Sequence, residues 1–434
     1  MKFYSTNKKS PLVDFREATI SGQAPDKGLY FPETIPVISK VMLEKIGDYP
    51  NEEIAYQVIR PYVGNCIPGK RLMQIVEDTI NFSIPLIKVT DSIYSLELFH
   101  GPTLAFKDIG ARFMSRCLGY FVGESSNQKV TVLVATSGDT GGAVANGFYK
   151  VDGVEVVILY PSGKVSAVQE KQLTTLGGNI HALEIEGSFD DCQQMVKLAF
   201  ADETLKQKRF LTSANSINVA RWLPQQFYYF FAFKQWADKE NPPVISVPSG
   251  NFGNICAGLL AQHSGLPVAH FIAACNSNDI VPRYMQTEKF EPRSAVPTLS
   301  NAMDVGNPSN FIRILEIFSH QFTDLQRKLS AVAITDKETT GAIADVFKQF
   351  GYVLDPHGAV GWLGLKRYLE KHLHEKGLFL ETAHPVKFPD AVEEYTGSKL
   401  NIPGTVQDII HRPKVSTVLP PTYDALKDYL MSEH

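Results

Sequence analysis

Short apolar runs rich in β-branched residues alternate with stretches of helical length over most of this chain. The predicted strands span residues 130–135, 154–160, 182–185, 243–247, 268–274 and 377–382. The predicted helices span residues 165–176, 190–208, 219–237, 254–261, 309–328, 337–349 and 358–372. Such alternation is typical of parallel sheets, because each parallel strand must return through a crossover helix. We therefore predict the α/β class, with doubly wound, largely parallel sheets.

The chain has 434 residues, which is too many for one ordinary core and predicts two or three domains. Residues 1–95 carry amphipathic stretches separated by proline and glycine, without the alternation seen later. We therefore predict a mainly helical N-terminal extension over residues 1–95.

Composition narrows the classes of partner. With 42 basic and 46 acidic residues the net charge is −4, too small to predict nucleic acid or an anionic membrane as partner. No stretch approaches the roughly 18 apolar residues of a membrane span, and the N-terminus lacks the apolar core of a signal peptide.

The five cysteines are scattered without a CxxC pair, which predicts reduced thiols in the cytoplasm. The histidines near residue 372 are interpreted as solvated surface, so we expect no metal.

Two glycine-rich segments follow predicted strands, where ligands bind in open α/β sheets. SGNFGN, residues 249–254, opens a helix and suits one compact phosphate, since glycines and helix N-terminal amides bind anions well. It lacks the Walker lysine and the dinucleotide spacing. TSGDTGG, residues 136–142, can surround a carboxylate or phosphate, although Asp139 opposes an anionic pocket unless its side chain points away. For both segments a purely structural turn, in the second case N-capping by Thr136 or Ser137, remains an alternative.

Lys107 is unusual in its setting, between Phe106 and Asp108 in the run HGPTLAFKD. A lysine withdrawn from water has a lowered pKa, which suits Schiff-base chemistry. A surface position is the ordinary alternative for any single lysine.

Two further segments combine hydroxyls with charged or aromatic groups. SANSINVAR, residues 213–221, offers neutral donors and one arginine, as binding of a second oxyanion requires, or else it caps the following helix. ETAHP, residues 381–385, follows the last strand and places a hydroxyl where it can meet an aromatic ring nitrogen. His384 is either catalytic or a structural histidine before proline.

Several motifs in one order closely resemble the threonine synthase family: LELFHGPTLAFKD, ATSGDTGGAV, LGGNI, SANSIN, VPSGNFGN, LSNAMDVGNPSN and ETAHP. They span residues 96 to about 390. The resemblance implies a fold-type-II pyridoxal-phosphate (PLP) enzyme with two α/β domains over residues 96–390, the smaller covering about 110–215. We expect residues 391–434 to form a C-terminal segment packed on the larger domain.

The resemblance also implies roles for individual residues. Lys107 matches the Schiff-base lysine, and Thr382 matches the hydroxyl that contacts the pyridine nitrogen. The loop for the cofactor phosphate matches Gly250, Asn251, Phe252, Gly253 and Asn254. The loop for the substrate α-carboxylate matches Ser137, Gly138, Asp139 and Thr140. The residues that match the recognition of the substrate phosphate are Lys164, Asn215, Ser216 and Arg221.

The implied reaction is PLP-dependent γ-elimination and β-addition, which converts O-phospho-L-homoserine and water to L-threonine and inorganic phosphate in the last step of threonine biosynthesis. The enzyme would be a carbon–oxygen lyase acting on phosphate, either a monomer or a homodimer. Three alternatives remain: another lyase on the same scaffold, a non-catalytic sensor of phosphorylated metabolites, and a nucleotide-binding protein built on residues 249–254.

Overall fold

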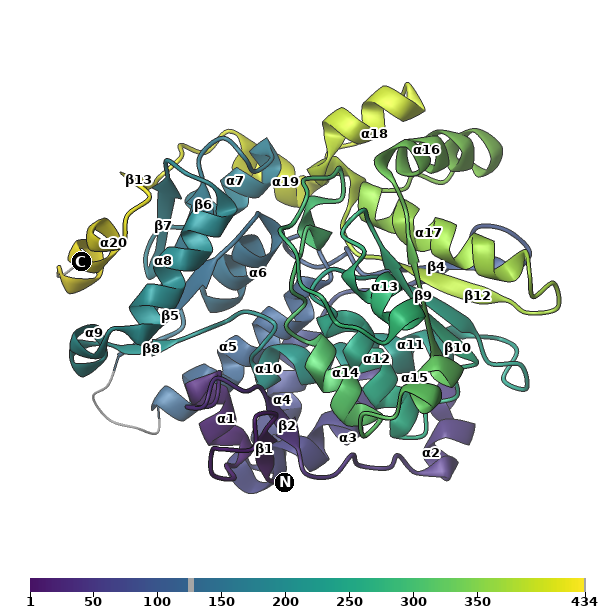
Figure 1. Cartoon of the computed structure of the whole chain (residues 1–434), viewed down its shortest axis with the longest axis horizontal. Coiled ribbons are helices and arrows are strands. Elements are labelled where there is room, and N and C mark those ends of the chain that lie inside the picture. The colour runs from purple at the N-terminus through teal and green to yellow at the C-terminus, as the bar shows by residue number, and fades with distance from the viewer. Residues whose placement is uncertain (124–128, 433–434) are drawn as a thin grey trace.

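Two β-sheets organise the chain in the computed structural model, which describes residues 1–123 and 129–432 (Figure 1). The six-stranded sheet has the order β11 (Leu329–Ala333), β10 (His270–Cys275), β9 (Val244–Pro248), β12 (Gly377–Glu381), β4 (Ile93–Glu97) and β3 (Leu86–Lys88), with only β3 antiparallel to its neighbour. The five-stranded sheet is parallel throughout, in the order β13 (Thr417–Leu419), β7 (Ile180–Ile185), β6 (Val154–Pro161), β5 (Val130–Ala135) and β8 (Phe210–Thr212). This confirms the predicted class.

Alternating side chains place helices on both faces of the six-stranded sheet. Neighbouring strand residues point to opposite faces of the sheet, so a strand that is apolar throughout must be covered by helices on both faces. Val244 and Phe379 pack with α16 (Asp336–Phe350) and α17 (Pro356–Leu369). Ile245 and Leu378, their neighbours in sequence, pack with the helices on the opposite face. These are α11 (Gln226–Gln235) and α12 (Gly253–His263).

The five-stranded sheet follows the same rule. Val132 and Val134 face α5 (Lys107–Gly123) and α6 (Asp139–Phe148). Leu133, between them in sequence, faces α8 (Phe189–Ala201). The remaining helices of this part of the chain are α7 (Ala167–Thr174), α9 (Glu203–Lys208) and α10 (Val219–Trp222).

Three predicted helices are each divided in two. The helix predicted for 190–208 breaks at Asp202, whose side chain caps α9 by accepting a hydrogen bond from the Leu205 amide. The helix predicted for 219–237 breaks at Pro224, where a 3₁₀ turn (η3, Leu223–Gln225) joins α10 to α11. The segment 309–328 forms α14 (Phe311–Ile317) and α15 (Phe322–Lys328), because Ser319 and His320 adopt left-handed backbone conformations.

The N-terminal region differs in two ways from the predicted helical extension over residues 1–95. It contains an antiparallel pair, β1 (Phe3–Ser5) with β2 (Tyr30–Pro32), and it contributes β3 and β4 to the six-stranded sheet. These strands are short and β3 is partly exposed, so they leave little apolar signal. The helices of the region are α1 (Phe15–Ser21), α2 (Lys40–Glu44), α3 (Asn51–Val63) and α4 (Gly69–Thr79), with 3₁₀ turns η1 (Ile46–Asp48) and η2 (Gly64–Cys66).

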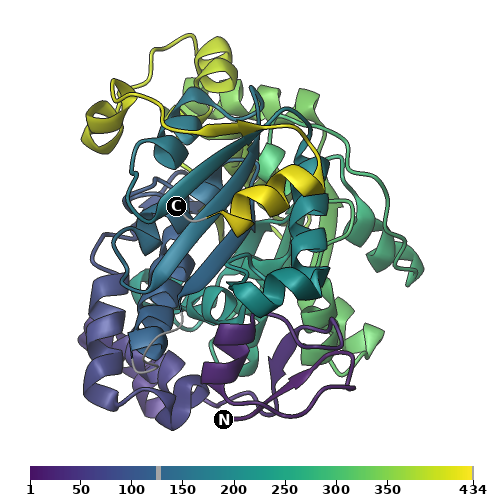
Figure 2. The same cartoon turned by 90° about the vertical axis from the view of Figure 1, so that its left-hand side faces the viewer.

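The predicted packing of residues 391–434 on the larger domain is wrong for most of the segment. Only α18 (Pro389–Thr396) packs against α16 of the six-stranded sheet. Strand β13 pairs with β7, α19 (Gly404–Ile410) contacts α7, and α20 (Tyr423–Met431) covers α8, as Figure 2 shows in yellow. The physical reason is that β7 would otherwise leave a sheet edge and an apolar face uncovered.

The last helical elements are α13 (Ile280–Thr287) and the 3₁₀ turns η4 (Asn301–Met303) and η5 (Pro385–Lys387). Among the described residues, none of the helices is both long enough and apolar enough to cross a lipid bilayer.

Candidate active site

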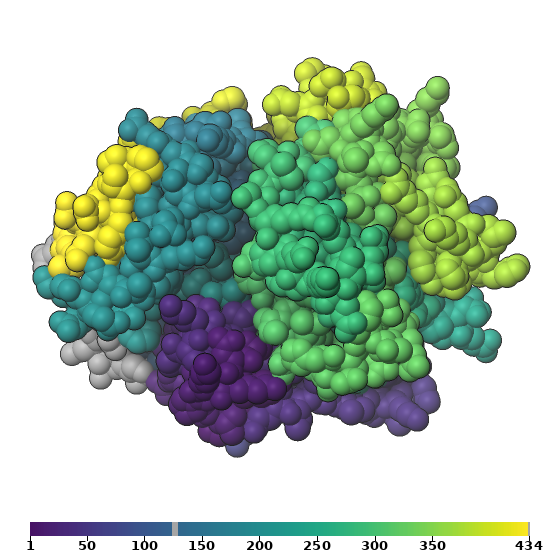
Figure 3. All heavy atoms as spheres, viewed as in Figure 1, coloured from purple at the N-terminus to yellow at the C-terminus, as the bar shows by residue number. Residues whose placement is uncertain are grey.

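The register of two central strands brings two predicted segments to one edge of the six-stranded sheet. Strands β9 and β12 are parallel neighbours, with Val244 opposite Gly377. Strand β9 therefore ends at the turn 249–254 beside the point where β12 runs into Thr382. Ligands bind at such carboxyl ends in open α/β sheets. The surface is hollowed between the part that carries the five-stranded sheet and the green part that carries most of the six-stranded sheet (Figure 3).

The segment before Lys107 is fixed to the same edge. Ala105 forms an isolated antiparallel bridge with Ala383, and the Phe106 amide donates to the Thr382 carbonyl at 2.9 Å. The Tyr228 hydroxyl donates to the Phe106 carbonyl. Lys107 is the first residue of α5, so these bonds hold its backbone one residue from the contact with Thr382.

The side chain of Lys107 lies half-buried, so it keeps a path to solvent while protein surrounds most of it. Loss of water lowers its pKa to about 8, against the raising effect of Asp139, and the positive charges of Lys387 and Arg221 add to the lowering. With this pKa, roughly a tenth of the amine is uncharged at pH 7, compared with less than about a thousandth for an ordinary lysine. Lys107 is therefore suited to nucleophilic and proton-transfer chemistry.

The turn 249–254 has the geometry of an anion cradle. Phe252 adopts a left-handed conformation, with φ of 61°, and α12 begins directly after it at Gly253. Within the described residues, the backbone amides of 250–254 have no hydrogen-bond acceptor. The buried amide nitrogen of Asn254 is also without a partner there, although its oxygen accepts from Tyr229 at 2.7 Å. Unpaired donors at a helix N-terminus fit a phosphate group.

Ser216 links the SANSIN segment to this cradle. Its hydroxyl oxygen accepts from the side-chain amides of Asn251 at 2.7 Å and Asn310 at 3.1 Å. The neighbouring Asn215 has a buried side-chain oxygen with no partner in the described part of the chain. The predicted substrate residues Asn215 and Ser216 therefore lie beside the turn predicted for the cofactor.

Arg221 is buried next to the first turn of α5. A Cβ atom added at Gly110 would lie 3.2 Å from its Nε atom, and its Nη1 donates to the Ala214 carbonyl at 2.5 Å. Burial lowers its pKa to about 10, so it remains charged at neutral pH. Nε has no acceptor among the described residues, which leaves a donor for an anion.

The turn 136–142 is both capped and open to an anion. The Thr136 hydroxyl accepts from the amides of Gly138 at 3.0 Å and Gly141 at 2.8 Å, so it binds an amide in the first turn of α6, although the N-cap residue itself is Gly138. The amides of Ser137, Asp139 and Thr140 have no acceptor in the part of the chain that the structure describes. Capping and ligand binding are therefore compatible in this turn.

Two other candidate residues, Lys164 and His384, lie in different settings. Lys164 is exposed in the turn after β6. Hydrogen bonds with Ser188 lower the pKa of Asp191 and the charge of Lys164 adds to this lowering, so the structure does not group Lys164 with Arg221. His384 is the N-cap residue before η5, where its Nδ1 accepts from the Val386 amide, and burial lowers its pKa to about 4. This capping contact agrees with the structural alternative. No group of three His, Cys, Asp or Glu side chains in residues 1–123 and 129–432 could hold a metal ion.

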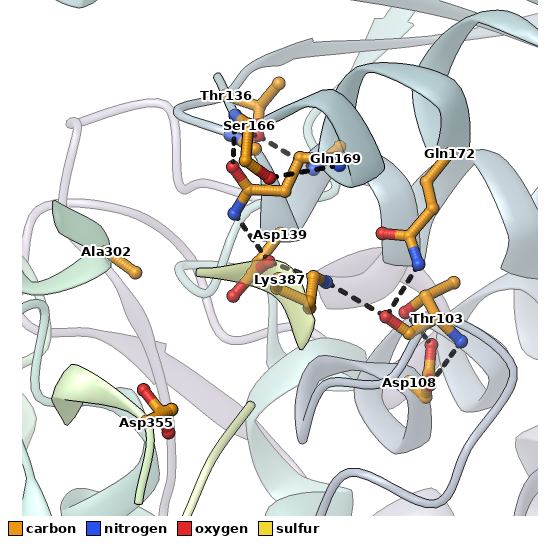
Figure 4. Close-up of polar contacts among 12 residues, drawn as sticks. Thr103, Asp108, Thr136, Asp139, Ser166, Gln169, Gln172, Ala302, Asp355 and Lys387 are labelled. Carbon is orange, nitrogen blue, oxygen red and sulfur yellow. Dashed lines mark hydrogen bonds and ion pairs between the residues drawn. The ribbon is translucent and has the colours of Figure 1, made fainter. Parts of the chain in front are cut away.

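Sequence reasoning missed Lys387, which lies buried between the two sheets. Its Nζ atom is 2.6 Å from Asp139 Oδ1 and donates to the Thr103 carbonyl at 2.9 Å (Figure 4). Asp139 was expected to oppose an anionic pocket in the turn 136–142. Lys387 balances this negative charge, so the turn can still receive an anion. The sequence carried a signal, since Lys387 stands between Val386 and Phe388 much as Lys107 stands beside Phe106.

Comparisons with known proteins cover the whole chain. Residues 85–380 match the pyridoxal-phosphate dependent enzyme family, residues 2–80 the threonine synthase N terminus, and residues 358–430 the threonine synthase C-terminal family. The chain is 43% identical to threonine synthase of Serratia marcescens, over 99% of each. Its fold is similar to a crystal structure of Escherichia coli threonine synthase, with a TM-score of 0.92 at 42% identity, covering 99% of each chain. PLP-bound threonine synthase from Brucella melitensis gives a TM-score of 0.93 at 34% identity, covering 99% of this chain and 98% of that one.

Proposed function

The chain belongs to the threonine synthase family, and we propose that the site around Lys107 performs this family's reaction. The reaction converts O-phospho-L-homoserine and water to L-threonine and inorganic phosphate, the last step of threonine biosynthesis, with PLP as cofactor. The observation that best supports the placement of the site is the bond between Phe106 and Thr382, which joins the lysine to the edge formed by β9 and β12.

Each part of the cofactor has a matching group in the chain. Nζ of Lys107 would hold the aldehyde carbon, and the unpaired amides of 250–254 would hold the phosphate. Thr382 would donate to the pyridine nitrogen. When bound, the cofactor supplies an electron sink that makes protons on the substrate carbons acidic.

The remaining residues would bind and orient the substrate. Its α-carboxylate would accept from the amides of Ser137 and Thr140, and its phosphate would lie near Asn215, Ser216 and Arg221. The guanidinium of Arg221 would stabilise the negative charge on the phosphate as it departs.

Lys107 would also move protons at the substrate carbons. An amine with a pKa of about 8 can accept a proton and return it near neutral pH without a large energetic penalty in either direction. Its half-buried position at the start of α5, beside the strand edge, restricts water around these transfers.

The site residues bear on assembly, and the cysteines bear on location. We propose that one chain forms a complete site, since every proposed group comes from it, so the enzyme could act as a monomer or as each half of a homodimer. We propose a cytoplasmic location, because all five cysteines are free thiols and four of them are buried.

The purified chain with PLP is expected to release phosphate from O-phosphohomoserine and to form an equal amount of threonine. Phosphate release coupled to amino-acid chromatography measures both products. Formation of 2-oxobutyrate in place of threonine would instead indicate a phospho-lyase on the same scaffold. Bound PLP without turnover of any phospho-amino acid would indicate a sensor.

Gly250→Ala is expected to weaken PLP binding about 10–100-fold, which corresponds to about 1–3 kcal/mol of overpacking. An added Cβ would lie 2.5 Å from the Met303 Cα atom. The Met303 segment cannot withdraw freely, because the Ala302 amide donates to His357, which is itself held by Asp355 at 2.6 Å. Titration of the cofactor-free chain with PLP, followed by absorbance, measures the dissociation constant.

Gly341→Ala is the matched control. Gly341 lies in α16, and an added Cβ would meet no atom within 4 Å. Alanine there should leave PLP affinity unchanged and stabilise the helix by about 0.5–1 kcal/mol. Equal PLP affinity in the Gly250 and Gly341 variants would contradict the assignment of the cradle.

A further inference from the structure

Lys387 connects the two sheets at the site. It ends η5, five residues after Thr382, and so belongs to the chain leaving the six-stranded sheet. Its partner Asp139 begins α6 in the other part of the molecule. Both side chains are almost fully buried, at 0% and 4% relative exposure. Figure 4 shows the lysine reaching between Asp139 and Thr103.

Asp139 is held by donors in the orientation that meets Lys387. Besides the ion pair, its Oδ1 accepts from Gln169 Nε2 at 2.9 Å. Burial alone would raise its pKa, but the charges of Lys387 and Lys107 and the hydrogen bonds from Lys387 and Gln169 outweigh burial and lower it below the ordinary value. A fixed negative charge therefore lies in the turn proposed for the substrate carboxylate.

We propose that Lys387 is a positioning residue whose ammonium group neutralises Asp139, so that this carboxylate neither captures Lys107 in an ion pair nor repels an anionic substrate. The second half of this inference rests on the proposed function, whereas the first half concerns only the chain's own residues. Lys387 thus controls how much of Lys107 is available as free amine.

A structural role alone would not require charge. Buried ion pairs contribute little net stability compared with apolar groups of similar volume. Charged or titratable groups near Lys107 and its partners include Asp108 and Arg112 on α5, Asp139 on α6, Arg221 on α10, Tyr228 on α11, His384 directly before η5 and Lys387 on η5. Asp139 and Lys387 act on Lys107 in opposite directions, and this opposition can be measured.

The test uses the full-length chain freed of PLP and three variants. Acetylation of Lys107 by acetic anhydride, followed by peptide mass spectrometry across pH, gives the pKa of its amine. The wild-type value is expected at about 8. Lys387→Met should raise the pKa by about one unit or more, since Asp139 is then free to attract a proton to Lys107. Asp139→Asn should lower it, since the charges of Lys387 and Arg221 then act on Lys107 without the opposing charge of Asp139.

The double variant Lys387→Met/Asp139→Asn should return the pKa towards the wild-type value. It removes both members of the Lys387–Asp139 pair, so neither is left buried without the other, and it keeps the test valid if Lys387→Met alone does not fold. The inference would be overturned if both single variants shifted the pKa of Lys107 in the same direction. It would also be overturned if the pKa in the double variant did not return towards the wild-type value.

The loaded enzyme provides an independent measurement. Lys387→Met should raise the KM for O-phosphohomoserine at least about tenfold, and the added Asp139→Asn change should recover most of it, because removing the carboxylate removes the repulsion. An unchanged KM in Lys387→Met would refute the repulsion of substrate. If wild-type Lys107 binds no PLP, the proposed function fails. The acetylation experiment still shows whether Lys387 and Asp139 shift the pKa of Lys107 in opposite directions.

Discussion

Lys107→Ala is expected to abolish both the visible absorbance of bound PLP and the formation of threonine. Alanine has no amine to hold the aldehyde carbon and none to move protons at the substrate. General acid–base catalysis alone accounts for about 10²–10⁴-fold in rate, so the loss of kcat/KM should be at least about 10⁴-fold once the attachment is also lost. An absorbance spectrum of the purified variant and a phosphate-release assay measure the two effects.

Two variants control this experiment. Lys107→Arg keeps a positive charge without a nucleophilic amine, and it should also lose the absorbance. Lys88→Ala removes an exposed lysine that pairs with Asp91 at 2.8 Å, and it should leave both measurements unchanged. Retention of the cofactor's visible absorbance in Lys107→Ala would show that another group holds PLP.

The sequence located Lys107 but not Lys387, the buried lysine that pairs with Asp139. Lys107 was recognisable because its local motif and the resemblance agree on it. Lys387 has a similar apolar setting, yet its function depends on a contact with Asp139 across 248 positions of the chain. No local pattern indicates which distant carboxylate a buried lysine meets, so only the folded arrangement of η5 against α6 reveals the pair.

The fold was predictable where burial is regular. Strands 130–135 and 154–160 were predicted almost to the residue, because β5 and β6 are buried along nearly their whole length. Strands β11 and β13 were missed, because both are short and partly exposed strands at sheet edges. The break at Asp202 carried a local signal, an N-capping aspartate, that the apolar periodicity concealed.

Arg313 shows how the N-terminal region supports the site. It is fully buried and, in the described part of the chain, has no carboxylate partner. Its guanidinium instead donates to the carbonyls of Tyr30 at 2.9 Å, Ser216 at 3.2 Å and Ile217 at 2.6 Å. Its Cζ atom lies 4.3 Å from the centre of the Trp222 ring. Burial lowers its pKa to about 9, so it stays charged and joins β2 to the SANSIN segment.

Arg313→Leu is therefore expected to lower the free energy of unfolding by about 3–5 kcal/mol, since each buried carbonyl left without a donor costs about 1–3 kcal/mol. The loss should also reduce PLP affinity, because Arg313 donates to Asn310, which donates in turn to the Ser216 hydroxyl beside the cradle. Denaturant unfolding and PLP titration measure the two effects.

The matched control for this change is Arg327→Leu, which removes an exposed arginine paired with Asp324 at 3.1 Å. Its cost should stay below about 1 kcal/mol, as for other surface ion pairs. If Arg313→Leu cost no more than this control, the carbonyls of residues 30, 216 and 217 must find other donors, and the connection between the N-terminal region and the site would not depend on the guanidinium. Because the expected difference exceeds about 2 kcal/mol, a single pair of unfolding curves decides between the two outcomes.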